Sequence, residues 1–481
     1  MTKRALSWII AASMLLSMGG CVSQQSPTSV IEGEGQILLE SSSAETPFYE
    51  PESPPADPES SLDSSSSQVP SSAPPVSSSA SADPSVSGSV SSSQASSQSV
   101  PSSSSASSSE SSEPDDDYTP APLDEVRAVW LSYLDLGPML TNKTQAQFTS
   151  SIRSAFQKLS DMGMNTVYAQ VRPFGDALYP SEYFPQSYLF TGTEGGVGEV
   201  PFDALQIMVD EAHRLDLRLE AWINPYRIRA DAAAASARPL SADNPANDYL
   251  DAGSDVVLEY NGGYFYNPGS AEARRLIVSG VEEIVENYAV DGIHFDDYFY
   301  PSGASASFDR ETYQASGTSK GLAAWRREQV NLLIKQVYNA VGSDKVFGVS
   351  PAGNNANNYD LLYCDVASWL SAPGYVDYIC PQVYFAFGNS TCPYKDTVRL
   401  FNDLIKQSSG VTLIVGLAAY KIGDSTYGSE WTNNSDMMKR QVEYARTLSR
   451  YDGFALYRYD FVVSEKAQIK TEMSNLMDIL D

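Results

Sequence analysis

From residue 126 to the C-terminus, short apolar runs alternate with longer stretches in which apolar residues recur every three to four positions. The short runs are typical of buried strands, and the longer periodicity is typical of amphipathic helices. Strands that alternate with helices in this way indicate parallel βαβ units. The predicted strands span 126–133, 165–172, 217–224, 292–296, 346–350, 375–384, 413–419 and 453–457. The predicted helices span 145–162, 202–215, 271–288, 323–341 and 436–449.

The eight predicted strands favour a closed barrel. No glycine-rich nucleotide-binding turn is found among them, which disfavours a doubly wound sheet. We therefore predict an α/β fold in which residues 122–481 form a (β/α)8 TIM barrel. In such a barrel, the residues that follow the carboxyl ends of the strands surround the functional site.

The first 21 residues have a different pattern, that of a targeting segment. Lys3 and Arg4 precede an apolar run over 5–18, and Gly19 and Gly20 lead to Cys21. This order resembles a bacterial lipoprotein signal peptide, in which the cysteine is lipidated, and an ordinary secretory signal is the alternative. No later run reaches the roughly 20 apolar residues of a membrane span. We predict a lipid-anchored protein of the cell envelope, on the extracellular face of the membrane.

Residues 22–121 are rich in Ser, Pro and acidic residues. Such a segment buries too little apolar surface to offset its ordering entropy, so we predict a disordered linker between anchor and barrel. The whole chain has 60 acidic residues against 31 Lys and Arg, a net charge of −29. Nucleic acid is excluded as a partner, because phosphate binding requires clustered cations.

The chain has few candidate metal ligands. It has two histidines, His213 and His294, and no CxxC pair, so we predict no metal site and no cofactor. Apart from Cys21, the cysteines are Cys364, Cys380 and Cys392. An odd number in an exported protein permits one disulfide with one thiol left over, and three free thiols are the alternative.

Polar and aromatic side chains follow the carboxyl ends of most predicted strands. Aromatic faces stack on sugar rings, and amide, carboxylate and guanidinium groups bind sugar hydroxyls, so this mixture indicates a carbohydrate site. A purely structural aromatic rim is the alternative. The predicted substrate-binding residues are Arg172, Trp222, Asn224, Arg227, His294, Tyr298, Tyr300, Asn354, Gln382, Tyr384 and Tyr420.

The strand at 292–296 carries the strongest signal of catalysis. Side chains alternate along a strand, so His294 and Asp296 point the same way, into the barrel mouth, and Asp297 follows at the strand end. Glycoside hydrolysis requires two carboxyl groups beside the glycosidic bond. We predict Asp296 and Asp297 as that pair; capping of a helix or pairing with an arginine is the alternative for Asp297. Asp176 and Asp460 are reserve candidates for the second carboxyl group.

A further acid, Glu220, lies within the predicted strand at 217–224. It shares the strand face of Trp222 and Asn224. It is interpreted as a buried, ion-paired residue of the barrel, with a third pocket carboxylate as the alternative.

A series of short motifs resembles glycosyl hydrolase-like family 10. The motifs lie, in order, at 126–130, 221–222, 224–227, 267–269, 291–293, 296–298, 300–301, 348–351, 381–382 and 384. The resemblance implies a (β/α)8 glycosidase, often a lipoprotein, and some members of the family cut peptidoglycan glycan strands stripped of peptides. One difference is Glu220, because members often have histidine there.

These observations predict hydrolysis of glycosidic bonds in an extracellular or cell-wall polysaccharide by paired carboxylates. The alternative is a non-catalytic carbohydrate-binding or wall-tethering lipoprotein, which would bind glycans without releasing products. A transglycosylase, recognised by products longer than its substrate, is a third hypothesis.

Overall fold

The computed structural model describes residues 121–196 and 201–480. The predicted signal segment 1–21 with its lipidation site Cys21, and residues 22–120 of the predicted linker, lie outside the described residues. Among those described, no helix has the combination of length and apolarity that crossing a membrane requires.

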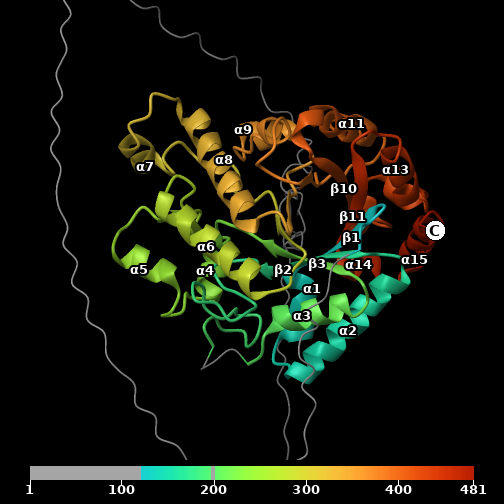
Figure 1. The fold of residues 1–481 in the computed structure, drawn as a ribbon, viewed down its shortest axis with the longest axis horizontal. Coiled ribbons are helices and arrows are strands. Elements are labelled where there is room, and N and C mark those ends of the chain that lie inside the picture. Colours follow the sequence, from blue (N-terminus) through green and yellow to red (C-terminus); the bar gives the residue numbers. More distant parts are fainter. Residues whose placement is uncertain (1–120, 197–200, 481) are drawn as a thin grey trace, which may run out of the picture. The chain divides into compact units, whose positions relative to one another are not determined.

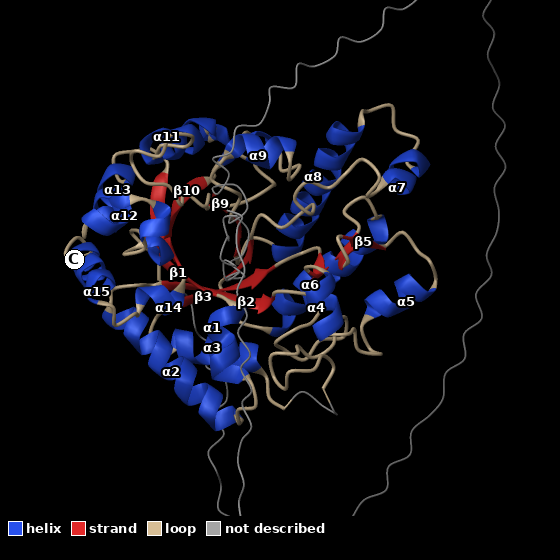
Figure 2. Ribbon diagram, turned by 180° about the vertical axis from the view of Figure 1, so that it is seen from behind, coloured by secondary structure: helices blue, strands red, loops and turns tan. Residues whose placement is uncertain are grey.

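Eight parallel strands form a closed barrel in the order β1-β11-β10-β9-β8-β7-β3-β2. Figure 2 shows these strands as an inner ring surrounded by helices. The predicted TIM barrel is therefore confirmed, and each barrel strand falls within or beside a predicted one. The barrel strands are β1 (Val126–Leu131), β2 (Thr166–Arg172), β3 (Arg218–Ile223), β7 (Gly292–Phe295), β8 (Val346–Val349), β9 (Tyr378–Ile379), β10 (Thr412–Ala418) and β11 (Tyr451–Tyr457).

The longer helices lie between consecutive barrel strands, except α15, which follows β11, and they bury one face against the barrel (Figure 1). They are α2 (Gln145–Asp161), α3 (Ala204–His213), α6 (Ala271–Asn287), α8 (Leu322–Val341), α11 (Tyr394–Leu404), α13 (Met437–Ala445) and α15 (Ala467–Met477). Shorter helices are α1 (Tyr133–Leu140), α4 (Ala232–Ala237), α5 (Pro245–Asp251), α7 (Arg310–Ala315), α9 (Asn355–Asp360), α10 (Val366–Trp369), α12 (Ser429–Asn433) and α14 (Tyr459–Val462). Three short 3-10 turns are Gln407–Ser409, Ala419–Lys421 and Ser425–Tyr427.

A small antiparallel sheet, not predicted from the sequence pattern, is inserted between β3 and α6. Its strands are β4 (Arg227–Arg229), β5 (Val257–Tyr260) and β6 (Gly263–Tyr266), in the order β4-β6-β5. Asn261 and Gly262 join β5 to β6, and both have positive φ, +51° and +76°. An Asn-Gly pair with this backbone is typical of a type I′ hairpin turn.

Aromatic rings fill the interior of the barrel. Trp130, Tyr168, Trp222 and Tyr378 form an interior cluster that is separate from the larger core between strands and helices. Tyr378 crosses the barrel over Gly348, where an added Cβ would lie 1.9 Å from its ring. Only glycine at 348 leaves room for this tyrosine.

A register shift in β2 changes which side chains face the interior. Gln170 pairs with Trp222, but Arg172 pairs with Ile223, so one extra residue separates the two pairs on β2. Ile223 belongs to the outer core, and Arg172 takes the same orientation, with its guanidinium 4.3 Å from the ring of Phe184. Gln170 therefore faces the barrel interior and Arg172 faces outward.

Candidate active site

A pocket opens at the carboxyl ends of the barrel strands. It is lined by Trp130, Trp222, Asp296, Asp297, Tyr298, Ser350, Gln382, Tyr384 and Tyr457. These residues come from β1, β3 and β11 and from the segments that follow β7, β8 and β9. Two carboxylates and five aromatic side chains thus share one pocket at the end of the barrel where such enzymes carry out chemistry.

Three N–H donors converge on the carboxylate of Asp296, which is 3% exposed. The indole Nε1 of Trp222 donates to Oδ2 over 3.1 Å, and Asn224 Nδ2 donates to the same oxygen over 2.5 Å. The backbone N–H of Tyr298 donates to Oδ1 over 3.2 Å. An ionised carboxylate can only accept hydrogen bonds, so this set of donors suits it.

A chain of amides fixes the orientation of Asn224. The backbone N–H of Tyr133 donates to Gln170 Oε1 over 2.8 Å, which directs Gln170 Nε2 to Asn224 Oδ1 over 2.6 Å. Asn224 must then present its Nδ2 donor to Asp296. Because the first donor is a backbone N–H group, the fold determines which atom donates and which accepts in each of these amide hydrogen bonds.

Asp297 also reaches the pocket and is 4% exposed. Its Oδ1 accepts from Gln382 Nε2 over 3.2 Å, and the same amide nitrogen donates to the backbone oxygen of Ser350 over 3.0 Å. Gln382 follows β9 and forms isolated bridges with Ala352 and Gly416. Neighbouring barrel segments therefore position the amide that holds Asp297.

The aromatic rings of Trp130, Tyr384 and Tyr457 form one wall of the pocket. The rings of Tyr384 and Tyr457 lie 5.7 Å apart, and Trp130 lies 5.9 Å from Tyr457. Tyr420, which is not among the residues that line the pocket, contacts both tyrosines, with ring centroids 5.8 and 6.0 Å away. The wall offers flat faces and hydroxyl groups of the kind that sugar rings require.

Two buried titratable groups lie beneath the pocket. Burial lowers the pKa of His294 to about 3, so its ring is neutral at physiological pH. Burial raises the pKa of Glu220 to about 8, although the hydrogen bond from Tyr378 opposes that shift. In the part of the chain that is described, no group of three His, Cys, Asp or Glu side chains is arranged to hold a metal ion.

The sequence model of the glycosyl hydrolase-like 10 family matches residues 125–433. The chain is 35% identical to glycosyl hydrolase YngK of Bacillus subtilis, over 68% of this chain and 67% of that protein. It is 33% identical to glycosyl hydrolase DigH of Escherichia coli K12, over 71% of this chain and 85% of that protein. The chain belongs to the glycosyl hydrolase-like 10 family. Membership makes it a glycoside hydrolase and its substrate a carbohydrate.

Among solved structures, a similar fold is found in the PgaB (BpsB) glycoside hydrolase domain from Bordetella bronchiseptica. The identity is 14% and the TM-score 0.48, over 73% of this chain and 99% of that one. The assignment of the barrel rests on the order of this chain's own strands.

Several of the residues predicted to bind substrate lie together at the pocket. Trp222, Tyr298, Gln382 and Tyr384 line it, and Asn224 is buried directly behind Asp296. Arg227 lies next to the pocket, with its guanidinium 4.3 Å from the ring of Tyr298 and its Nε and Nη2 donating to the Pro173 backbone oxygen.

Other predicted binding residues lie elsewhere. The register shift in β2 turns Arg172 out of the barrel. His294 is fully buried below the pocket, and Tyr300 is buried, with its hydroxyl donating to Asp309. Asn354 caps α9, where its Oδ1 accepts from the Ala356 N–H.

Neither reserve carboxylate reaches the pocket. Asp176 is fully buried and accepts from the backbone N–H of Tyr188, so it holds the loop after β2, and burial raises its pKa. Asp460 is exposed on α14, and its backbone N–H bonds to Asp135. Glu220 is buried with the Tyr378 hydroxyl as its hydrogen-bond partner, rather than the predicted ion pair.

Four residues of the site were not predicted from the sequence. Trp130, Ser350 and Tyr457 line the pocket, and Gln170 orients Asn224. Strand alternation contained the signal for Trp130, since it is two residues from Ala128, whose side chain also faces the interior. Tyr457 lies beyond the segment that matches the family model.

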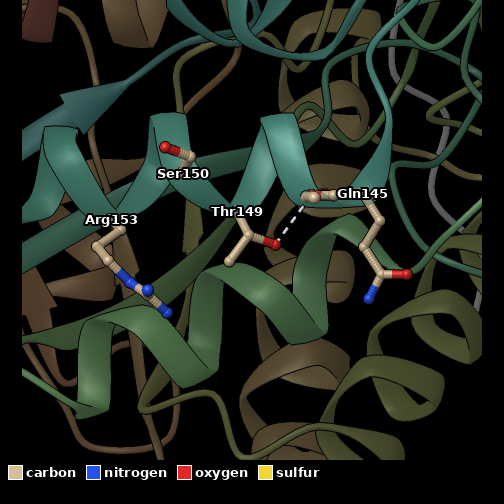
Figure 3. A pocket seen from close by; sticks show the side chains of 5 residues that line it. Gln145, Thr149, Ser150 and Arg153 are labelled. Atoms are coloured by element: carbon tan, nitrogen blue, oxygen red, sulfur yellow. Dashed lines mark hydrogen bonds between the residues drawn. The ribbon is translucent and has the colours of Figure 1, made fainter.

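A second depression lies on the outer surface of α2, away from the carboxylates. Figure 3 shows the side chains of Gln145, Thr149, Ser150 and Arg153 on this helix. Arg153 forms an ion pair with Glu211 of α3, and Thr149 Oγ1 donates to the Gln145 backbone oxygen. These contacts join and stabilise helices, and no carboxylate or aromatic side chain lines the depression.

Proposed function

We propose that this chain hydrolyses a glycosidic bond in a cell-envelope polysaccharide, with Asp296 and Asp297 as its two carboxyl groups. The observation that carries the proposal is that both carboxylates line one aromatic-walled pocket at the carboxyl ends of the strands. Asp176 and Asp460, the reserve candidates for the second carboxyl group, do not line that pocket.

In this mechanism, one carboxyl group protonates the oxygen of the departing sugar as the glycosidic bond breaks. The other carboxylate attacks the anomeric carbon, or takes a proton from the water that attacks it. Water supplies the new hydroxyl group in both cases, so no cofactor is required. The fixed donors around Asp296 would hold its charge beside the positive charge that develops on the sugar.

Peptidoglycan glycan strands stripped of peptides are the proposed substrate. The resemblance of the motifs to a family with such members supports this choice, and the rings of Trp130, Trp222, Tyr384 and Tyr457 offer stacking surfaces for amino-sugar rings. The proposed location is the extracellular face of the membrane, with Cys21 as the lipid anchor and residues 22–121 as the linker.

The test is digestion of purified peptidoglycan, with and without its peptides, followed by mass spectrometry of the products. We expect new reducing ends from the peptide-free strands with the unmodified chain and none with Asp296→Asn. Binding without products would favour the non-catalytic alternative. Products longer than the substrate would indicate a transglycosylase.

A further inference from the structure

A chain of buried hydrogen bonds runs from the pocket to the interior of the barrel. Trp130 Nε1 donates to His294 Nε2 over 3.1 Å, and His294 Nδ1 lies 2.7 Å from the Tyr378 hydroxyl. The Tyr378 hydroxyl donates to Glu220 Oε2 over 2.5 Å. These four side chains come from β1, β7, β9 and β3, so the chain of bonds crosses the barrel.

The Trp130 indole, at the start of this series, fixes which group donates in each hydrogen bond. An indole N–H can only donate, so His294 Nε2 must accept, and the neutral ring carries its proton on Nδ1. That proton is donated to Tyr378, whose own proton is donated to Glu220. Burial, which lowers the pKa of His294 to about 3, keeps the ring in this neutral form.

The neighbouring rings leave His294 no alternative position. Tyr168 stacks on the imidazole with ring centroids 4.1 Å apart, and Trp222 lies edge-on at 6.5 Å. Of the four hydrogen-bonded side chains, Trp130 is the one that lines the pocket. A change at Glu220 can therefore reach Trp130 through Tyr378 and His294.

We propose that Glu220, Tyr378 and His294 are positioning residues that hold the indole of Trp130 as a wall of the sugar-binding pocket. The inference rests on the proposed function, because it assigns Trp130 to the pocket in which Asp296 acts. Two pocket indoles are then held by their N–H groups in different ways: Trp222 by Asp296 itself, and Trp130 by the buried chain.

The matched variants are Tyr378→Phe and Tyr168→Phe in the full-length chain. Both remove one buried hydroxyl group from neighbouring rings, but only the Tyr378 hydroxyl links His294 to Glu220, whereas that of Tyr168 lies beside the Tyr378 hydroxyl and bonds to neither His294 nor Glu220. Tyr378→Phe should raise KM for peptide-free glycan strands about fivefold, the effect of one lost hydrogen bond, with kcat nearly unchanged. Tyr168→Phe should leave KM within about twofold of its original value.

Glu220 provides a second comparison. Glu220→Gln retains an oxygen that accepts from Tyr378 and should keep KM near its original value. Glu220→Leu removes the acceptor and should raise KM as Tyr378→Phe does. Equal KM for Glu220→Leu and Glu220→Gln, or equal effects of the two tyrosine variants, would overturn the proposal.

A measurement without substrate separates this inference from the proposed function. The chain has two histidines, so ¹⁵N-histidine labelling gives two pairs of ring-nitrogen signals, and a His213→Asn variant identifies the pair of His294. We expect the Nδ1-protonated form, with no titration between about pH 5 and 8, and a shifted Nδ1 resonance in Tyr378→Phe, where the Nδ1 proton has lost its acceptor. An Nε2-protonated ring would overturn the inference, whereas turnover by Asp296→Asn would overturn the proposed function alone.

Discussion

The indole Nε1 of Trp222 lies 3.1 Å from Oδ2 of Asp296, so a wall of the pocket and its central carboxylate are fixed by the same hydrogen bond. Trp222 lies within β3, and Asp296 follows β7, its neighbour in the barrel. The pairing of these two strands therefore determines where the carboxylate points.

Asp296→Asn should abolish activity without unfolding the protein. The substitution keeps the shape of the side chain but removes the negative charge that stabilises an oxocarbenium-like transition state. We expect kcat to fall at least about a thousandfold, equivalent to about 4 kcal/mol. Asp460→Asn, on the exposed surface of α14, is the control and should retain its turnover. A folded Asp296→Asn protein with near-normal turnover would contradict the assignment.

Gln170→Glu should reverse the orientation of the Asn224 amide, which donates to Asp296. A glutamate can still accept from the Tyr133 N–H, but it cannot donate to Asn224, whose amide would turn its oxygen toward Asp296. A lost bond to a charged group is equivalent to about 1.5–3 kcal/mol, so kcat should fall about tenfold or more. Gln314→Glu on the exposed side of α7 is the matched control. An unchanged kcat would show that Gln170 does not orient Asn224.

Glu220→Gln should reduce the loss of folding stability that occurs as the pH rises. The pKa of Glu220 is raised to about 8 by burial and by Asp291 and Asp377, against the effects of Tyr378 and Arg218. In the unfolded chain Glu220 releases its proton near the ordinary pKa of 4.5, whereas in the folded chain it keeps that proton up to about pH 8. The retained proton stabilises the fold at low pH, and this stabilisation is lost as the pH rises from about 4.5 to about 8.

The measurement is Tm between about pH 5 and 9 for both proteins. Glu472, whose pKa burial raises to about 7, contributes in the same direction, so the variant should retain part of the slope. Parallel curves for the two proteins would show that Glu220 does not retain a proton in the fold.

Gly348→Ala should destabilise the barrel. The added Cβ would lie 1.9 Å from the Tyr378 ring, which has no free space into which to move. Overpacking of this kind costs about 1–3 kcal/mol or more, which urea unfolding measures directly. Gly321→Ala is the control, since nothing lies within 4 Å of its added Cβ. Equal stability of both variants would mean that the ring can move aside.

Cys21→Ser should release the chain from membranes. A lipid contributes about 0.8 kcal/mol per buried CH₂ group, and the substitution removes the site of its attachment. Fractionation of cells that express each form is the measurement. Sedimentation of the variant with membranes at high salt would contradict the lipid anchor.

The barrel was predictable because each strand is a short apolar run, but the details depend on contacts that no local pattern contains. The strand predicted at 375–384 pairs regularly only at Tyr378–Ile379, because Pro381 has no N–H to donate. The hairpin of the inserted sheet has a local signal, Asn261-Gly262, but this turn signal is not part of the pattern of apolar runs that predicts the barrel strands.

The site was predictable where strand alternation holds. It placed Asp296 correctly at the mouth, and Trp222 with it. It does not apply across the register shift of β2, so the orientation of Arg172 could not be obtained from the sequence. Trp130 and Gln170 depend on partners in distant segments, His294 and Asn224, which only the closed barrel brings together.

The same register shift has an electrostatic consequence. The pocket lining contains two carboxylates and no Lys or Arg, whereas a regular β2 would have aimed the Arg172 guanidinium at the mouth. A cation roughly 8 Å from the reacting carbon, at an effective dielectric constant of about 20, would raise the energy of a positively charged sugar by about 2 kcal/mol. That corresponds to roughly a thirtyfold slower reaction. One extra residue in a single strand thus keeps the charge of Arg172 away from a reaction that develops a positive charge, and leaves Arg227, against the ring of Tyr298, as the cation at the edge of the pocket.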